Sequence, residues 1–196
     1  MDRELEARAA DLASAAGELL GRSANWPAAA FLVADTSVFM QHPDKVEDLD
    51  FRPLVSVRQE AVHLLVPILI VDELDGLKRS RDMRWRASYT LAVFEKCVSA
   101  PGRVGRLREA DFSALDDGGI PRGEVTVEIV LDPSGHVRLP VNDDEIIDRA
   151  VALQILAGRP LTIATYDTGQ AMRARATPLT VCKLPMPAEE ADKSVP

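Results

Sequence analysis

The chain has 196 residues and a formal net charge of −8, and hydrophobic residues make up 46% of it. This length suits one domain with at most a helical appendage, and the composition favours a substantial core over disorder. No apolar run approaches the roughly 20 residues that span a bilayer, and the N-terminus lacks the pattern of a signal peptide. We therefore expect a cytoplasmic protein with no membrane partner. An acidic chain is also a poor fit for a general nucleic-acid coat protein, although it does not exclude a nuclease.

The first half of the chain begins with a predicted helix over residues 4–21, where Leu and Ala recur at helical spacing. After a short linker, the continuously apolar run at residues 29–34 indicates a strand that is covered on both faces. The elements expected next are a buried strand at 63–67, helices starting at 68 and spanning 85–98, and a loop at 100–123.

The second half contains an alternating segment, EVTVEIVLD, which predicts a half-exposed strand. The turn signal DPSG and the run HVRLPV follow it and predict an inserted hairpin between residues 123 and 140, at an edge of the sheet. A strong helix comes next, with Asn142 or Asp143 as its N-cap. The remaining elements are a buried strand at 161–165, a helix at 168–176, a last strand at 179–184 and a flexible tail at 185–196.

The alternation of strands and helices predicts the α/β class, as a three-layer α/β/α sandwich around a mostly parallel sheet. The expected additions are an extra N-terminal helix with its linker over residues 1–25 and the small inserted hairpin. The main domain is expected to span residues 29–184. Right-handed crossovers would bring the ends of the first and fourth main strands side by side.

Carboxylates stand where these elements meet the ligand-binding edge of an open α/β sheet, beyond the carboxyl ends of its strands. Asp35 and Asp167 directly follow apolar strands, Glu73 lies early in a helix that follows a strand, and Asp143 opens another helix. Each acid alone also fits a turn or a cap. Together they would repel one another without a cation, and oxygen ligands suit Mg²⁺ or Mn²⁺ rather than zinc. The combination indicates metal-dependent phosphoryl chemistry.

Four motifs surround these acids: V-A-D-T-S-V-F, V-P-I-L-I-V-D-E-L-D-G-L-K-R, N-D-D-E-I-I and T-Y-D-T. They resemble the motifs of the PIN domain family, and the resemblance runs from about residue 31 to residue 184. The first two motifs are fairly specific, whereas the last two are short. The resemblance implies a central parallel sheet flanked by helices and a ribonuclease that depends on Mg²⁺ or Mn²⁺.

The resemblance also implies roles for individual residues. Ser37 and Thr165 would supply hydroxyl groups that orient a ligand or a water molecule. The third acid is a choice between neighbours, because Asp143 and Asp144 cannot both point the same way on a helix. The acids implied as metal-binding and catalytic are Asp35, Glu73, Asp143 and Asp167, with Asp144 as a flanking metal ligand.

A basic segment, residues 78–86, directly follows the helix that bears the second acid. We expect Lys78, Arg79 and Arg81 to bind RNA phosphates, although cations at a helix C-terminus also interact favourably with the helix dipole. Trp85 is available to stack on a base, but a tryptophan at helical spacing from a tyrosine more often lies in the core.

The leading hypothesis is an endoribonuclease that hydrolyses RNA phosphodiester bonds through an acidic Mg²⁺ or Mn²⁺ site. One alternative is a catalytically silent PIN-like module that binds RNA or a protein. Another is the toxin of a toxin–antitoxin pair, whose partner would be an antitoxin-like protein inhibitor. The N-terminal helix and the inserted hairpin depart from a minimal PIN toxin. That helix is a candidate to cover the sheet edge, to shield the site or to form a homo-oligomer.

Overall fold

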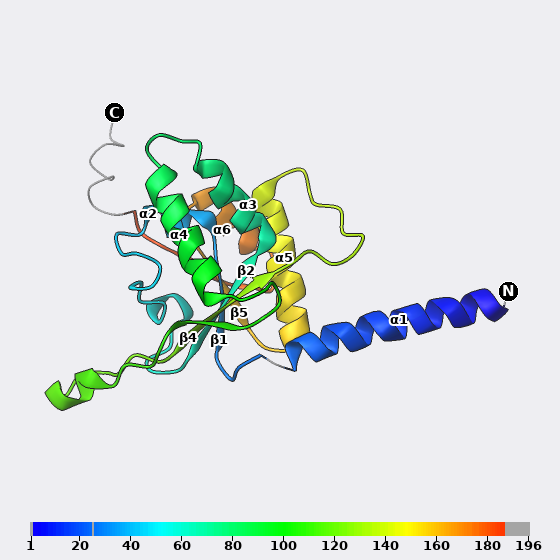
Figure 1. Cartoon of the computed structure of the whole chain (residues 1–196), viewed down its shortest axis with the longest axis horizontal. Helices are drawn as coiled ribbons and strands as arrows, with labels where there is room; N and C mark the ends of the chain where they lie inside the picture. Colours follow the sequence, from blue (N-terminus) through cyan, green and yellow to red (C-terminus); the bar gives the residue numbers. More distant parts are fainter. Residues whose placement is uncertain (1, 25, 187–196) are drawn as a thin grey trace.

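The computed structural model describes residues 2–24 and 26–186 and contains a six-stranded sheet with helices on both faces (Figure 1). The predicted α/β class is confirmed, whereas the flexible tail falls outside the described residues from 187 onward. The strand order is β3-β4-β2-β1-β5-β6, and only β3 is antiparallel. The strands are β1 (Ala30–Ala34), β2 (Val62–Pro67), β3 (Gly105–Arg108), β4 (Val125–Val130), β5 (Leu161–Thr165) and β6 (Thr180–Lys183).

The helices lie in two groups around this sheet, since α3 packs on α4 and α5 packs on α6 (Figure 1). Five of the six α-helices belong to the sandwich, and α1 extends beyond it. The α-helices are α1 (Asp2–Ser23), α2 (Thr36–Gln41), α3 (Ile68–Leu77), α4 (Arg84–Cys97), α5 (Asn142–Ala157) and α6 (Thr168–Ala174), and the short 3-10 helices are η1 (Pro53–Val55) and η2 (Ser113–Asp117).

The core lies around the central strands because their sequences are mostly apolar, and their polar residues His63, Thr162 and Thr165 are buried as well. All residues of β2 and β5 are buried, and β1 is buried from Phe31 to Ala34. Full burial of a Leu or Val side chain contributes roughly 1.5–3 kcal/mol, so the strands hold the sheet between its helix layers. β1 and β5 pair directly, with Phe31 opposite Leu161, as the expected crossovers require. Their carboxyl ends therefore lie side by side.

The hairpin predicted between residues 123 and 140 is wrong. β4 is an internal strand that pairs parallel with β2, and its antiparallel neighbour is β3. β3 lies in the segment 100–123, which the sequence had indicated as a loop, and the described residues 131–141 contain no strand. The turn signal in that segment is real, but the chain after it leads to α5 rather than back along the sheet.

The predicted exposure of β4 is also wrong, because all six of its residues are buried. Its polar side chains have partners from distant parts of the chain. His63 Nδ1 lies 2.8 Å from the Thr126 hydroxyl, and the Trp26 indole donates to Glu128 Oε2 at 2.7 Å. A buried polar group is tolerated when it is hydrogen-bonded, so alternation in the sequence did not require an exposed face.

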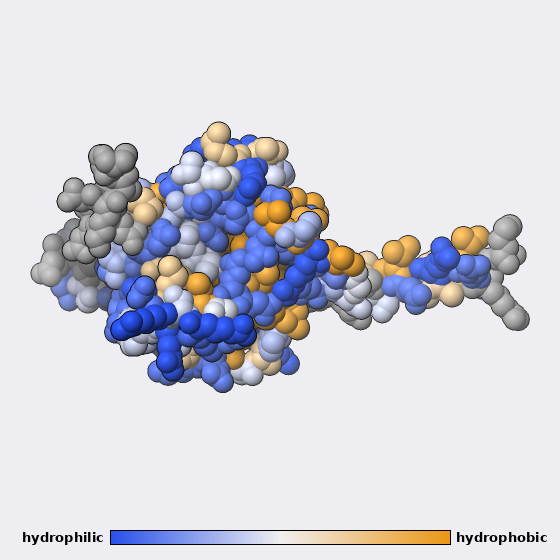
Figure 2. Space-filling model, turned by 90° about the horizontal axis from the view of Figure 1, so that it is seen from above, coloured by the Kyte–Doolittle hydropathy of each residue, from blue (hydrophilic) through white to orange (hydrophobic). Residues whose placement is uncertain are grey.

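The predicted N-terminal helix is present as α1, which projects away from the sandwich (Figures 1 and 2). The C-terminal end of α1 contacts α5 (Figure 1). Toward its N-terminus, the side chains of Leu5 and Leu12 are 61% and 72% exposed. Among the described residues, no helix combines the length and apolar character that a membrane crossing requires.

Candidate active site

Asp35 lies directly after β1 and caps the N-terminus of α2. Its Oδ2 accepts hydrogen bonds from the Ser37 hydroxyl at 2.6 Å, from the Thr165 hydroxyl at 2.9 Å and from the Ser37 amide at 3.3 Å. The side chain is buried, and this burial raises the pKa of the Asp35 carboxyl, although the hydrogen bonds act in the opposite direction. The donors orient the carboxylate without neutralising its charge.

The same hydroxyl groups connect the ends of β1 and β5. The Thr165 hydroxyl accepts from the Asp167 amide at 2.9 Å, and the Ser37 hydroxyl accepts from the Tyr166 amide at 2.9 Å. Asp167 is exposed and caps α6, where its Oδ1 accepts from the Gln170 amide at 2.6 Å. Asp35 and Asp167 are thus held on neighbouring strand ends through one shared hydroxyl residue.

Glu73 connects α3 with two other elements of the site. Its Oε2 accepts from the Thr36 hydroxyl at the start of α2, and its Oε1 accepts from the Asn142 amide group at 2.7 Å. The predicted capping of α5 by Asn142 or Asp143 is wrong, since the N-cap position is Val141 and has no side-chain hydrogen bond. Asn142 instead uses its side chain to join α5 to Glu73.

Asp143 and Asp144 both face Arg173 of α6. The Arg173 guanidinium donates to Asp143 Oδ2 at 2.7 Å, and its Nε lies 3.5 Å from Asp144 Oδ1. The Arg173 guanidinium group therefore contacts both candidates for the third acid. The choice between them stays open, although the shorter contact belongs to Asp143.

Hydrogen bonds thus join all four acid motifs at one edge of the sheet. Within residues 2–24 and 26–186, the predicted acids form no group of three whose ligand atoms all lie within 4.8 Å of one another. Asp35, Glu73 and Asp167 form no ion pair with a basic side chain of those residues. Carboxylate oxygens without a protein counter-ion fit a hard cation such as Mg²⁺ or Mn²⁺.

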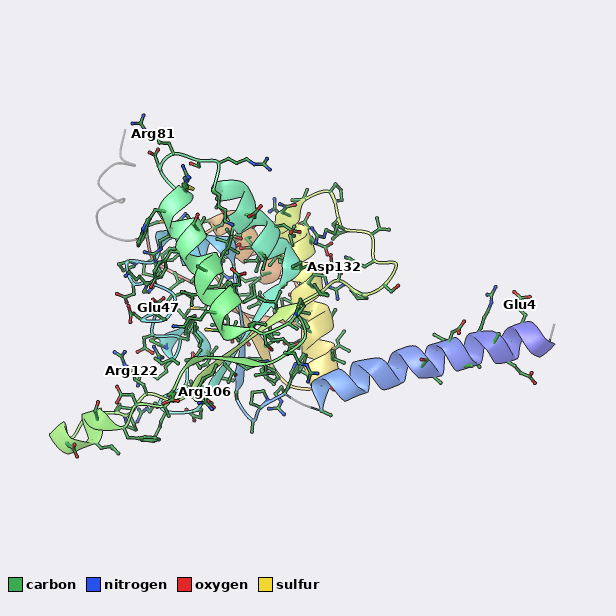
Figure 3. All side chains as sticks on the ribbon, in the orientation of Figure 1. Glu4, Glu47, Arg81, Arg106, Arg122 and Asp132 are labelled. Atoms are coloured by element: carbon green, nitrogen blue, oxygen red, sulfur yellow. The ribbon has the colours of Figure 1, made fainter. Side chains whose placement is uncertain are left out.

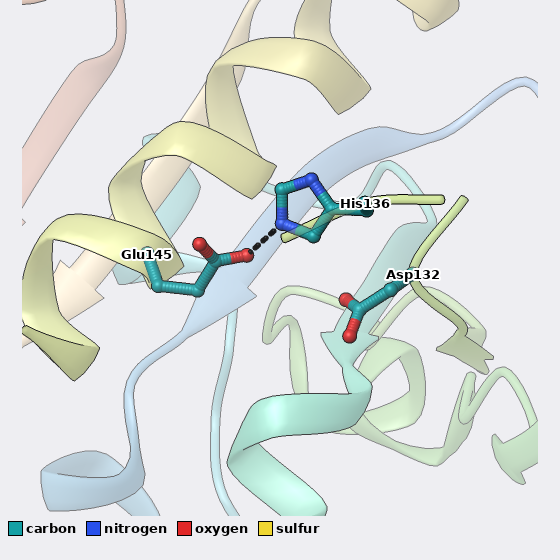
Figure 4. A group of neighbouring side chains, drawn as sticks. All are labelled: Asp132, His136 and Glu145. Atoms are coloured by element: carbon teal, nitrogen blue, oxygen red, sulfur yellow. Dashed lines mark hydrogen bonds and ion pairs between the residues drawn. The ribbon is translucent and has the colours of Figure 1, made fainter. Parts of the chain in front are cut away.

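A second group of ionisable side chains comes from α5 and from the connection between β4 and α5, and no periodic pattern in the sequence indicated it (Figure 4). The ligand atoms of Asp132, His136 and Glu145 all lie within 4.8 Å of one another. His136 Nε2 is 2.6 Å from Glu145 Oε1, and the Leu139 amide donates to Glu145 Oε2 at 2.8 Å. Asp132 accepts from Arg138 at 2.7 Å. The bonds from His136 and Leu139 to Glu145 attach this connection to α5, whereas Asp132 bonds within the connection.

The predicted phosphate-binding residues differ in their surroundings. Lys78 forms an ion pair with Asp75 at 2.8 Å, whereas Arg79 and Arg81 are exposed. Arg81 points away from the body of the protein at the end where the strands terminate (Figure 3). Seen from above that end, the surface is largely hydrophilic (Figure 2). Arg79 and Arg81 therefore keep their charges available to a phosphate.

Fold and site together define an α/β domain whose parallel strands end at an edge where acidic motifs are joined by hydrogen bonds. The PIN domain family model matches residues 32–184, more than half of the chain, and the chain belongs to the PIN domain family. This match confirms the resemblance that the four motifs indicated. PIN domains are usually nucleases and typically use divalent metal ions, which agrees with the chemistry of the acids.

Other comparisons give less information. A comparison with curated proteins gives no match. Among solved structures, the chain is similar to a domain of a functionally unknown protein from Methanocaldococcus jannaschii DSM 2661. The identity is 13% and the TM-score 0.47, with 81% of this chain and 94% of that chain covered. No functional conclusion follows from a similarity of this kind.

Proposed function

We propose that this PIN domain is a metal-dependent endoribonuclease that hydrolyses RNA phosphodiester bonds. The supporting observation is the convergence of four acid motifs through hydrogen bonds, with Asp35, Glu73 and Asp167 free of basic partners among the described residues. Membership of a family whose domains are usually nucleases supports the same reaction class.

Asp35, Glu73 and Asp167 are the proposed ligands of Mg²⁺ or Mn²⁺, with Asp143 or Asp144 completing the set. When bound, such an ion activates a water molecule for in-line attack at phosphorus and stabilises the leaving oxygen.

The chain's own contribution is orientation. Ser37 and Thr165 fix the Asp35 carboxylate, and Thr36 fixes Glu73. Because both acids are held by side-chain hydroxyl groups before a substrate binds, little reorganisation is needed on binding.

The direct test is cleavage of a labelled RNA by the purified protein. We expect cleavage with Mn²⁺ that leaves 5′-phosphate and 3′-hydroxyl ends, and loss of cleavage with EDTA or with Asp35→Asn. Asp148→Asn is the matched control, because Asp148 is an exposed acid on α5, one turn beyond Asp144. Full activity of Asp35→Asn, in a folded protein, would refute the proposed site.

One observation favours the catalytically silent alternative, namely the pairing of Arg173 with both candidates for the third acid. A metal ion at that position would compete with a guanidinium group that is already in place. Titration calorimetry with Mn²⁺ separates the two functions, since a silent module would bind no ion at millimolar concentration.

A further inference from the structure

Two aromatic rings lie stacked at the start of α4, and a lysine lies beside them. The ring centroids of Trp85 and Tyr89 are 5.3 Å apart, with an angle of 21° between the ring planes. Lys45 Nζ lies 4.8 Å from the centroid of Tyr89 and 5.9 Å from that of Trp85. Trp85 is nevertheless 62% exposed, so the expected core position of this residue is wrong. A large exposed aromatic side chain of this kind is available for binding.

The pair is held in place from both sides. The Tyr89 hydroxyl donates to Glu47 Oε1, which fixes the ring against the segment that carries Lys45. Arg86, between the two aromatic residues on α4, donates to the Phe39 carbonyl at 2.8 Å and also binds carbonyl groups just after α2. An aromatic surface that is already ordered loses little conformational entropy when a ligand binds to it.

The stacked rings and the acid site lie at opposite ends of one short helix. Asp35 caps the N-terminus of α2, and Arg86 binds the carbonyl of Phe39 near its C-terminus. A helix of six residues spans about 9 Å, so a few nucleotides of an extended strand suffice to reach from the rings to the acids.

Exposed cations that could bind phosphates lie near the rings in the sequence. Four of them form no ion pair within the described part of the chain, and one of these, Lys45, lies over both rings. They follow or precede the rings in sequence, and Arg81 points outward from the end of the molecule that carries the acids (Figure 3). Successive bases stack on aromatic side chains in single-stranded complexes while cations bind the phosphates. The four cations are Lys45, Arg79, Arg81 and Arg84.

We propose that Trp85, Tyr89 and Lys45 form a stacking platform for an unpaired base of single-stranded RNA, with the neighbouring arginines holding its phosphates. This inference rests on the proposed function, because it names the residues that would hold an RNA strand beside that same site. A duplex does not fit the platform, since its bases stack on one another and their faces are not available.

The test is binding of a short, labelled, unstructured RNA in EDTA, followed by fluorescence anisotropy, so that no cleavage interferes. We expect the single strand to bind more tightly than the same RNA annealed to its complement. Trp85→Ala should weaken single-strand binding about tenfold, because stacking of one base contributes roughly 1–3 kcal/mol. Phe112→Ala is the matched control, since Phe112 is also 62% exposed and lies beside η2. It should bind RNA like the wild type.

A second variant tests the electrostatic part. Arg81→Ala should weaken binding of all sequences about equally and reduce the slope of log K against log salt by about one. Lys96→Ala, an exposed lysine near the other end of α4, is its control and should leave the slope unchanged.

The two proposals fail in different ways. Binding that depends on Trp85 without any cleavage by the wild type supports the platform and refutes the nuclease. Cleavage by the wild type, with Trp85→Ala binding RNA as tightly as Phe112→Ala does, refutes the platform and leaves this surface to a protein partner. Equal affinity for single strand and duplex also refutes it.

Discussion

Asp35 is an acid that the fold buries, and none of the residues that the structure describes supplies a counter-ion for it. Burial is the largest influence on its pKa and raises it above 3.8, the value of an unperturbed Asp side chain. A raised pKa means that the folded state disfavours the ionised carboxylate. The resulting loss of stability is absent below the pKa of the unfolded chain and complete above the pKa of the folded protein.

Replacing Asp35 with Asn should therefore change stability in a pH-dependent way. In EDTA and near neutral pH, Asp35→Asn removes the disfavoured charge, so the variant should be stabilised relative to the wild type. This advantage should shrink as the pH falls through the raised pKa of Asp35 in the folded protein, and it should be gone below 3.8, where the acid is protonated in the folded and the unfolded wild type. Urea denaturation at both pH values measures it. A difference in stability that is independent of pH would show that the pKa of Asp35 is not raised.

A second residue-scale prediction concerns the buried carboxylate of Glu145. His136→Ala removes the partner of Glu145 Oε1, and a buried group left without a partner costs about 1–3 kcal/mol of unfolding free energy. His42→Ala is the matched control, because the two imidazole groups are 16% and 17% exposed while Asp44, the partner of His42, is exposed. Chemical denaturation should show the larger loss for His136→Ala. Equal losses would mean that ring packing, rather than the bond to Glu145, decides the effect.

At the scale of elements, the sheet and α1 contribute very differently to stability. Leu64 in β2 is fully buried, and Leu64→Ala should lower the unfolding free energy by about 2–5 kcal/mol. Leu12 on α1 is 72% exposed, so Leu12→Ala should change it by less than about 0.5 kcal/mol. Thermal denaturation at two protein concentrations measures both. A large effect of Leu12→Ala that grows with concentration would show that α1 is buried in a homo-oligomer.

The elements that the sequence predicted well are those whose environment is uniform along the chain. β1 is apolar throughout, β2 and β5 are apolar except for His63, Thr162 and Thr165, and α5 shows helical spacing over its whole length. The predicted exposure of β4 was wrong because the partners of its polar residues come from far away in sequence. Glu128 bonds to Trp26, and Thr126 bonds to His63, so a period-two pattern that looked half-exposed is buried. β3 is short and half-buried, so the charged segment around it looked like a loop.

The same difference between local sequence and distant partners decides which parts of the candidate site were predictable. The positions of Asp35 and Asp167 were predictable, because an acid within one or two residues of the end of a buried strand must lie at the carboxyl edge of a parallel sheet. Their proposed role as metal ligands stays a prediction. The choice between Asp143 and Asp144 was not, because Arg173, which contacts both, belongs to another helix. The exposure of Trp85 was equally hidden, since helical spacing fixes which residues are neighbours but not which side of the helix the fold covers.

At the scale of the whole molecule, the proposed metal site at the acidic edge would link metal binding to stability. The net charge of −8 includes a set of carboxylates that the fold gathers on one side, and their mutual repulsion favours the unfolded chain. A divalent cation bound only by the folded protein opposes that repulsion. The stabilisation follows from mass action and reaches about 2.7 kcal/mol at a free ion concentration a hundred times the Kd.

Mn²⁺ should therefore raise the thermal denaturation midpoint of the wild type, and the increase should be much smaller for Asp35→Asn. Asp148→Asn, which replaces an exposed acid outside the hydrogen-bonded acid motifs, should respond like the wild type. The response must be compared with a monovalent salt of equal ionic strength, because general screening also weakens repulsion among carboxylates. If Asp35→Asn responds fully while Asp132→Asn does not, the ion binds instead at the group of Asp132, His136 and Glu145. Such a result would assign the metal site to the connection between β4 and α5 instead of the acidic edge.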